Sequence, residues 1–390
     1  MRNRMGTRIS LGRIAGVEVG LTWSFLVILG LFVVSLAAGV FPTSNPGLGT
    51  ATYIAMGVVA AVLFFASILL HEIAHSVQAR REGMQVGGIT LWLLGGVSSF
   101  NGMFRSPGAE FRIGAAGPLV TLVIGAILVV LGYAIALPSA VDGVVVWLGL
   151  TNLFVLVFNL LPAFPLDGGR ILRSALWRLR GDLGWATRVA GAVSRALGAL
   201  MIAVGLVTFL FYGFGGLWLA LIGWFVMSAG TAEARVVEIR EALAGLSVSD
   251  AMVRDPITVP SDQTLQEFFD GAYSEHRHAT YPVMEGGAVV GLFAARDLDA
   301  VPRGTWRSVR VNTRMQPLSQ AVSVNEQDEL PDAFMSLLET DLRRALVLRD
   351  SRLTGLLSLS DVERLAEARR PSQPGRQRGS TSRRLTTPEP

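Results

Sequence analysis

The chain has 390 residues, of which 51% are hydrophobic and 16% charged, with a formal net charge of +4. This composition excludes an ordinary soluble enzyme, indicates an integral membrane protein and leaves room for two or three domains. Because the chain has no cysteine, disulfides and thiolate metal sites are excluded, and a zinc site would need histidine and carboxylate ligands. All 34 basic residues are arginines, spread over several loops and balanced by 30 acids, so nucleic-acid binding is not expected.

The amino-terminal residues are predicted to lie in the cytoplasm. Residues 8–19 alternate apolar and polar side chains around glycines, which predicts a short amphipathic strand or hairpin against the membrane face. The first apolar run starts only near Leu21, and no small-residue cleavage site accompanies it, so we interpret it as a retained anchor rather than a signal peptide. The first two membrane spans are predicted at residues 21–41 and 52–78.

The last turns of the second predicted span contain the sequence HEIAH, and Glu72 is the one formally charged residue between positions 20 and 79. In a helix His71 and His75 lie one turn apart on one face, so both imidazoles can reach one metal ion while Glu72 reaches a water bound to it. This is the HExxH pattern of zinc proteases. A helix with two scattered core histidines is the alternative, which the energetic cost of unpaired ionisable groups inside a membrane disfavours.

The next segment, residues 87–100, is rich in glycine and β-forming residues and too short to span a bilayer. A re-entrant hairpin beside the metal site is predicted, because non-helical backbone at membrane depth must be buried in protein or line a wet cavity. The third span is predicted at residues 113–137, where small residues allow close helix packing, and the fourth at 144–161.

The fourth predicted span leads into the sequence NLLPAFPLDGG, which begins at Asn159 and contains Asp167. Its two prolines break the helix ahead of Asp167. From residue 113 to residue 169 the charged residues are Asp142, in a predicted turn, and Asp167. A buried aspartate at a broken helix end is predicted to be a third zinc ligand, and an aspartate that caps a helix at the membrane boundary is the alternative.

Two weaker spans are predicted at residues 190–211 and 217–227, the second of them short and either tilted or half-embedded. Arginines gather before the first span and in alternate loops, whereas the loops at 42–50, 138–143 and 212–216 have none. The positive-inside rule therefore predicts a multi-pass protein of the cell inner (plasma) membrane with both termini cytoplasmic. The metal site is then expected near the cytoplasmic side of the bilayer.

The predicted zinc ligands, together with Glu72 and Asn159, could hydrolyse a peptide bond. Zinc held by His71, His75 and Asp167 would keep a fourth position for water, whose pKa the metal lowers toward about 7. Glu72 would take the proton of that water as general base and later deliver it to the leaving amine. The amide of Asn159 is expected to stabilise the oxyanion, with an interhelical hydrogen bond as the alternative role.

Three motifs in order, HEIAH at 71–75, GPLVT at 117–121 and NLLPAFPLDG at 159–168, closely resemble the site-2 protease family of intramembrane zinc metalloproteases over residues 8–230. The resemblance implies that His71, His75 and Asp167 bind Zn²⁺, that Glu72 is the catalytic acid/base and that Asn159 assists. It also implies a single-span membrane protein as substrate, such as an anti-sigma factor or a membrane-tethered transcription factor. With no PDZ-like insertion between spans, the chain resembles the branch that has a cytoplasmic carboxy-terminal regulatory domain.

Residues 246–298 and 315–365 repeat one plan, and the copies end in the related sequences GLFAARD and GLLSLSD. This region resembles a tandem CBS pair, which implies binding of ATP or another adenosine nucleotide through Ser358, Asp361 and Asp297. The first copy has Ala294 where serine or threonine is usual, so one working site is expected. A purely structural module is the alternative, and a homodimer through the pair is expected.

The predicted architecture is a polytopic α-helical membrane protein, with about six transmembrane helices and a small β element near the active site, joined to an α/β cytosolic CBS pair. The predicted function is hydrolysis of a peptide bond in the transmembrane segment of a membrane-anchored regulator, modulated by adenine nucleotide. A CBS-gated transporter or channel and an inactive membrane scaffold are the alternatives, and Glu72 beside two candidate ligands favours the protease. The predicted divisions are a cytoplasmic segment (1–20), the protease domain (21–230), a linker helix (231–245), two CBS domains (246–305 and 306–370) and a disordered tail (371–390).

Overall fold

The computed structural model describes residues 8–14, 16–92, 95–101 and 104–369. The chain forms two compact units, Met1–Glu238 with Glu339–Asp341, and Ile239–Leu338 with Leu342–Pro390. Six helices of the described residues are long and apolar enough to cross a membrane, all of them in or beginning in the first unit. The predicted polytopic helical class is therefore confirmed. The predicted tail at 371–390 lies outside the described residues.

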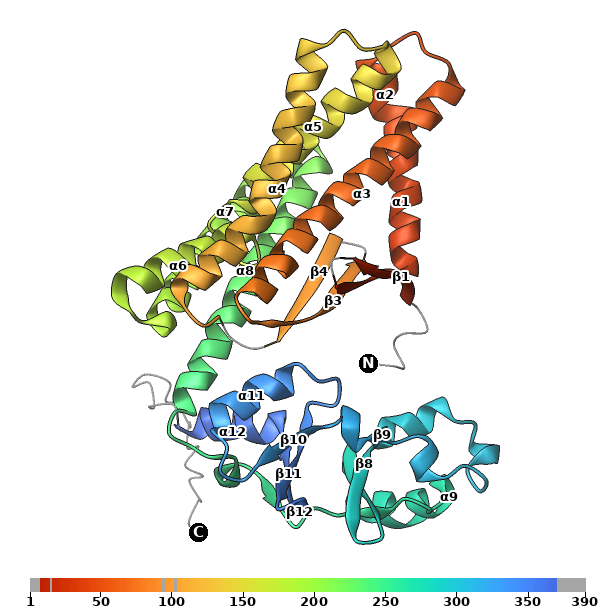
Figure 1. The fold of residues 1–390 in the computed structure, drawn as a ribbon, viewed down its shortest axis with the longest axis vertical. Coiled ribbons are helices and arrows are strands. Elements are labelled where there is room, and N and C mark those ends of the chain that lie inside the picture. The colour runs from red at the N-terminus through yellow and green to blue at the C-terminus, as the bar shows by residue number, and fades with distance from the viewer. Residues whose placement is uncertain (1–7, 15, 93–94, 102–103, 370–390) are drawn as a thin grey trace, which may run out of the picture. The chain divides into compact units, whose positions relative to one another are not determined.

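The helices of the first unit follow the apolar runs of the sequence, because a backbone in lipid must satisfy its hydrogen bonds within the segment. The first span is α1 (Trp23–Ser35), continued by the π-helical turn Leu36–Val40 and by α2 (Phe41–Ser44). The other candidate spans are α3 (Thr50–Arg81), α4 (Pro107–Ala134), α5 (Ser139–Asn159), α7 (Leu183–Tyr212) and α8 (Gly215–Ala242). The shorter α6 (Asp167–Arg180) is amphipathic, and Figure 1 shows it between α5 and α7 along the chain.

The predicted length of the sixth span was wrong. The sequence predicted a short span at 217–227 and a separate linker helix at 231–245, whereas both belong to α8, one helix of 28 residues that ends at Ala242. The helix continues because the polar residues after Met227 keep the same backbone hydrogen bonding. The end of an apolar run therefore does not mark the end of a helix. One helix therefore runs from the sixth span across the boundary between the two units at Glu238 and Ile239.

Both predicted hairpins of the first unit are present, and they form one four-stranded sheet in the order β1-β2-β3-β4. The strands are β1 (Arg8–Ile14), β2 (Val17–Thr22), β3 (Gln85–Trp92) and β4 (Gly95–Asn101). Each hairpin is antiparallel, and β2 pairs with β3 in parallel, with Val19 opposite Ile89. Figure 1 shows this sheet beside α3, with which β3 and β4 are in contact.

The second unit has two four-stranded sheets, in the orders β10-β11-β12-β5 and β6-β7-β8-β9. Its strands are β5 (Val253–Arg254), β6 (Val259–Pro260), β7 (Thr280–Glu285), β8 (Ala288–Ala294), β9 (Gln316–Pro317), β10 (Val322–Asn325), β11 (Arg344–Arg349) and β12 (Arg352–Ser358). Its α-helices are α9 (Leu265–Phe268), α10 (Ser274–His276), α11 (Leu330–Leu338) and α12 (Leu359–Arg369). The two sequence copies have the same strand order, and each sheet takes its edge strand, β5 or β9, from the other copy. The predicted α/β class is confirmed.

Candidate metal centre

The two histidines of the HEIAH sequence lie in the last turns of α3, on the face that the helix buries. His71 and His75 are both buried, and their Nε2 atoms are 3.0 Å apart. The helical spacing of four residues stacks them one above the other, as the sequence predicted. Both rings therefore present a nitrogen to the same point.

Asp167 is the first residue of α6 and faces that point. Its Oδ2 lies 3.2 Å from His71 Nε2, and its Oδ1 lies 3.2 Å from His75 Nε2. The turn between α5 and α6 is tight, since a Cβ on Gly168 would lie 2.3 Å from the carbonyl oxygens of Leu160 and Leu161. The glycine after Asp167 is thus required for the loop to fold back on the helix start.

The outer nitrogens of the two imidazoles have partners that set the orientation of each ring. His75 Nδ1 lies 2.6 Å from the carbonyl oxygen of Ile113, which can only accept, so Nδ1 carries the hydrogen. His71 Nδ1 lies 2.9 Å from Thr121 Oγ1, and that hydroxyl donates to the carbonyl oxygen of Gly117 at 3.3 Å. The His71 Nδ1–H therefore donates to Thr121. In their neutral forms both rings direct an Nε2 lone pair toward the centre.

Two lone pairs and a carboxylate that face one another across 3.0 to 3.2 Å repel unless a proton or a metal cation lies among them. Two imidazole nitrogens and one carboxylate oxygen form a ligand set of catalytic zinc sites, which keep one position open for water. The α4 backbone leaves space for the ion, because a Cβ on Gly117 would lie 2.3 Å from His75 Nε2 and 2.6 Å from His71 Nε2. The residues present therefore fit a zinc ion.

The two residues predicted to do the chemistry flank this centre in the sequence. Glu72 follows His71 on α3 and is partly buried. Asn159 is the last residue of α5 and is also partly buried. No described residue hydrogen-bonds the Asn159 amide, so the interhelical hydrogen bond considered from the sequence is not formed within the described part of the chain. The catalytic roles of both residues stay predictions.

A buried ion pair near the centre was not singled out in the sequence analysis. Arg173 of α6 donates from Nε to Oε1 of Glu110 at 2.7 Å, and both side chains are almost completely buried. Glu110 and Arg173 are far apart in the sequence, and neither belongs to a recognisable motif. No local signal in the sequence could have paired them.

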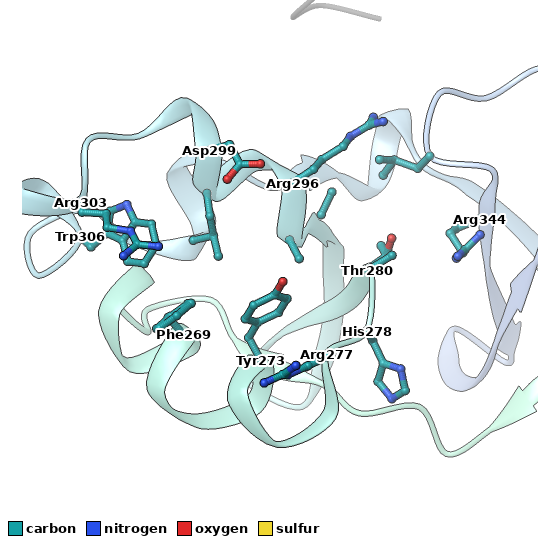
Figure 2. Close-up of a pocket in the computed structure, with 15 residues that line it drawn as sticks. Phe269, Tyr273, Arg277, His278, Thr280, Arg296, Asp299, Arg303, Trp306 and Arg344 are labelled. Atoms are coloured by element: carbon teal, nitrogen blue, oxygen red, sulfur yellow. The ribbon is translucent and has the colours of Figure 1, made fainter.

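The second unit contains a cavity of about 520 Å³, shown in Figure 2. Its walls carry four guanidinium groups and three aromatic rings, contributed by Arg277, Arg296, Arg303, Arg344, Phe269, Tyr273 and Trp306. The Arg303 guanidinium lies 5.5 Å from the centre of the Trp306 ring. In Figure 2 the Tyr273 hydroxyl points toward the middle of the cavity, between Asp299 and Thr280. The lining combines positive charge with flat apolar surface.

The three predicted nucleotide-binding residues are not among those that line this cavity. Ser358 Oγ caps the start of α12, because it accepts a hydrogen bond from the Asp361 backbone N–H at 3.1 Å, and its hydroxyl donates to the Asp361 carboxylate. Asp297 is half-buried, and burial raises the pKa of its carboxyl although Arg296 and Arg314 oppose the shift. Arg277, Arg303 and Arg344 line the cavity and lie outside the closing motifs. The nucleotide-binding role of Ser358, Asp361 and Asp297 stays a prediction.

A bundle of six candidate membrane spans with a buried histidine, histidine and aspartate centre fits a membrane metalloprotease. The family model "Peptidase family M50" matches residues 59–138 and 133–204, and the CBS domain model matches residues 248–302. Rip3 of Mycobacterium tuberculosis, named as a zinc metalloprotease, is 39% identical over 376 residues, which are 95% of each chain. The chain belongs to peptidase family M50, the site-2 protease family of zinc metalloproteases.

Two archaeal proteins are also similar to this chain. A zinc metalloprotease of Methanocaldococcus jannaschii is 29% identical over 360 residues, covering 92% of this chain and 96% of the relative. The solved structure of a site-2 protease from the same organism is 30% identical and covers 58% of this chain and 95% of that chain, with a TM-score of 0.40.

Proposed function

We propose that this metalloprotease cleaves a peptide bond in the transmembrane segment of a single-span, membrane-anchored regulatory protein. The observation that carries the proposal is the convergence of His71, His75 and Asp167, two of them on α3, a helix of 32 residues that is apolar enough to cross the bilayer. A substrate segment that itself lies in the membrane can reach a site on a spanning helix. An anti-sigma factor or a membrane-tethered transcription factor has that form, and regulated intramembrane proteolysis is the process that its cleavage serves.

The side chains divide the reaction between them. His71, His75 and Asp167 would hold zinc, which when bound polarises the scissile carbonyl and acidifies water. Glu72 accepts a proton from the attacking water and passes it to the leaving amine. The products are a new carboxy terminus and a new amino terminus. The Asn159 side-chain amide donates a hydrogen bond to the carbonyl oxygen as negative charge develops there.

The substitution Glu72→Gln tests this mechanism. It keeps the size of the side chain and the three proposed ligands but removes the base, so zinc content stays at the wild-type level while cleavage falls by about 10²- to 10⁴-fold. Cleavage of a candidate single-span substrate in proteoliposomes and zinc by mass spectrometry are the measurements. The exposed Glu285 offers a control, since Glu285→Gln makes the same chemical change in the second unit and is expected to cleave normally. A Glu72→Gln protein that cuts at the wild-type rate would show that the mechanism is wrong.

The orientation in the membrane is part of the proposal. The arginine distribution supports cytoplasmic termini and a metal centre near the cytoplasmic side of the plasma membrane. Because the chain has no cysteine, a single introduced cysteine reports accessibility without background. We expect an impermeant maleimide to label Ser44→Cys in intact cells and Arg178→Cys only after permeabilisation. The reverse pattern would contradict the orientation.

We further propose that an adenosine nucleotide binds in the second unit and modulates the protease. The cavity supports this, because guanidinium groups pair with phosphates and its aromatic rings can stack on a base. Calorimetry of the full chain with ATP, AMP and S-adenosylmethionine tests binding. Arg303→Met is expected to weaken binding about 10-fold or more, and the exposed Arg307→Met, outside the cavity, to leave it unchanged. No heat with any of the three would leave a structural module that joins two copies, which light scattering would reveal as a dimer.

A further inference from the structure

The helix that carries Asp167 is tied to the rest of the centre by one buried side chain. Arg173 lies six residues after Asp167 on α6, and its side chain is 10% exposed. Its Nη2 and Nε lie 2.5 Å and 2.7 Å from Oε1 of Glu110, whose side chain is fully buried in the first turn of α4. The same α4 continues to Gly117 and Thr121 at the histidine pair.

Glu110 depends on this pairing. Its second oxygen, Oε2, is buried and has no hydrogen-bond partner in the described part of the chain. Arg173 therefore supplies the hydrogen bonds that described residues make to the Glu110 side chain. Removing one partner of a buried ion pair leaves an uncompensated charge, so the pair strongly favours one position of α6 against α4.

Arg173 also reaches the loop that precedes Asp167 and the helix that leads out of the first unit. Its guanidinium lies 5.1 Å from the centre of the Phe164 ring, and Nη1 lies 3.3 Å from Oε2 of Glu233 on α8. The backbone N–H of Phe164 donates to Ser194 Oγ of α7 at 2.8 Å. The loop is thus held from two sides.

We propose that Arg173 is a positioning residue for the metal centre. It does not touch the centre itself; by locking α6 against α4 and the Phe164 loop it sets the Asp167 carboxylate opposite the two imidazoles. Both Asp167 oxygens lie 3.2 Å from an imidazole nitrogen, so a small shift of α6 would lengthen both contacts together. The role rests on the proposed zinc site and adds a residue to it that is not a ligand.

The test compares Arg173→Met with Arg178→Met. Both change an arginine of α6 to methionine, but Arg178 is exposed. Zinc affinity of the purified full chain is measured by competition with a chromophoric chelator, and the ligand geometry by the visible absorption of the Co²⁺-substituted protein. We expect Arg173→Met to bind zinc about 10- to 100-fold more weakly and to show an altered Co²⁺ spectrum, while Arg178→Met matches the wild type. These readouts do not depend on which peptide is cut.

Arg173→Lys is a second variant that can be measured if Arg173→Met does not fold. Lysine keeps the charge but cannot supply the planar group that contacts Glu110 with two nitrogens, so zinc affinity between that of wild type and Arg173→Met is expected. Folded Arg173 variants with wild-type zinc affinity and an unchanged Co²⁺ spectrum would overturn the positioning role alone. A wild-type protein that binds neither ion would instead overturn the proposed function on which the role rests.

Discussion

At the residue scale, the metal centre needs a residue without a side chain at position 117. The residue lies on α4, and the absence of a Cβ leaves the space between that helix and the two Nε2 atoms of α3. Its carbonyl oxygen also accepts the Thr121 hydroxyl, which in turn orients His71. One glycine therefore makes room for the metal and contributes to ring alignment. Loss of an outer partner of this kind typically costs about 10- to 100-fold in metal affinity.

Gly117→Ala is expected to weaken zinc binding about 10-fold or more, because the new methyl group would lie within 2.6 Å of both imidazole nitrogens. Chelator competition on the folded, purified protein measures the change. Gly114→Ala is the matched control: it lies on the same helix, and its Cβ would make ordinary contact with Ile171 Cγ1 at 3.4 Å. Equal zinc affinity in the two variants would show that the space at Gly117 is not used by the ion.

At the element scale, α7 and α8 pack through matched glycines. Positions 191, 198 and 205 of α7 and positions 216, 223 and 230 of α8 are all glycine, in steps of seven. A Cβ on Gly198 would lie 2.5 Å from the Gly223 carbonyl oxygen, and one on Gly223 would lie 2.6 Å from the Gly198 carbonyl oxygen. Such close backbone approach is how small residues drive helix association in membranes. The pair supports the site because α7 carries Ser194, the partner of the loop before Asp167.

Gly198→Ala is expected to lower the free energy of unfolding by about 1–3 kcal/mol, since the added methyl group meets backbone that cannot move aside without separating the helices. Thermal unfolding in detergent micelles reports the loss. Gly215→Ala adds the same methyl group at the start of α8, where no other atom lies within 4 Å, and a change within about 0.5 kcal/mol is expected there. A Gly198→Ala protein as stable as Gly215→Ala would argue against tight packing of this pair.

At the scale of the whole molecule, the proposed ligands join two distant parts of the chain. His71 and His75 belong to α3, whereas Asp167 starts α6, after α4 and α5 have crossed the bundle. A bound ion would therefore cross-link the folded first unit and would have no comparable site in the unfolded chain. Binding of that kind adds directly to folding stability.

Removal of zinc is expected to destabilise the first unit by about 2.7 kcal/mol under conditions where free zinc is 100 times its dissociation constant. The melting temperature before chelation, after chelation and after zinc is restored measures the effect. His71→Ala removes one proposed ligand, so chelator should no longer change its melting temperature. A wild-type melting temperature that is insensitive to both chelator and zinc would contradict the cross-link.

The sequence by itself determined the features that depend on residues close together in the chain. Long apolar runs define the spans because backbone in lipid must bond internally, and helical geometry places His71 and His75 on one face wherever that helix lies. The sequence also predicted the two hairpins at 8–19 and 87–100 and the duplicated plan of the second unit, because each depends on residues close together in the chain. Hydropathy did not show that the predicted span at 217–227 and the predicted linker helix at 231–245 form one helix, because a helix can continue after its apolar run has ended.

The sequence analysis predicted that Asp167 joins the histidine pair, but other contacts between distant segments were decided by the tertiary structure. The Ile113 and Thr121 contacts that fix the tautomers and the Arg173 pairing with Glu110 link different helices. The exchange of β5 and β9 between the two copies, and the cavity lined by Arg303, are of the same kind. The physical reason is packing. Which helix or strand faces meet depends on all the contacts along whole elements, and a short stretch of sequence does not determine them.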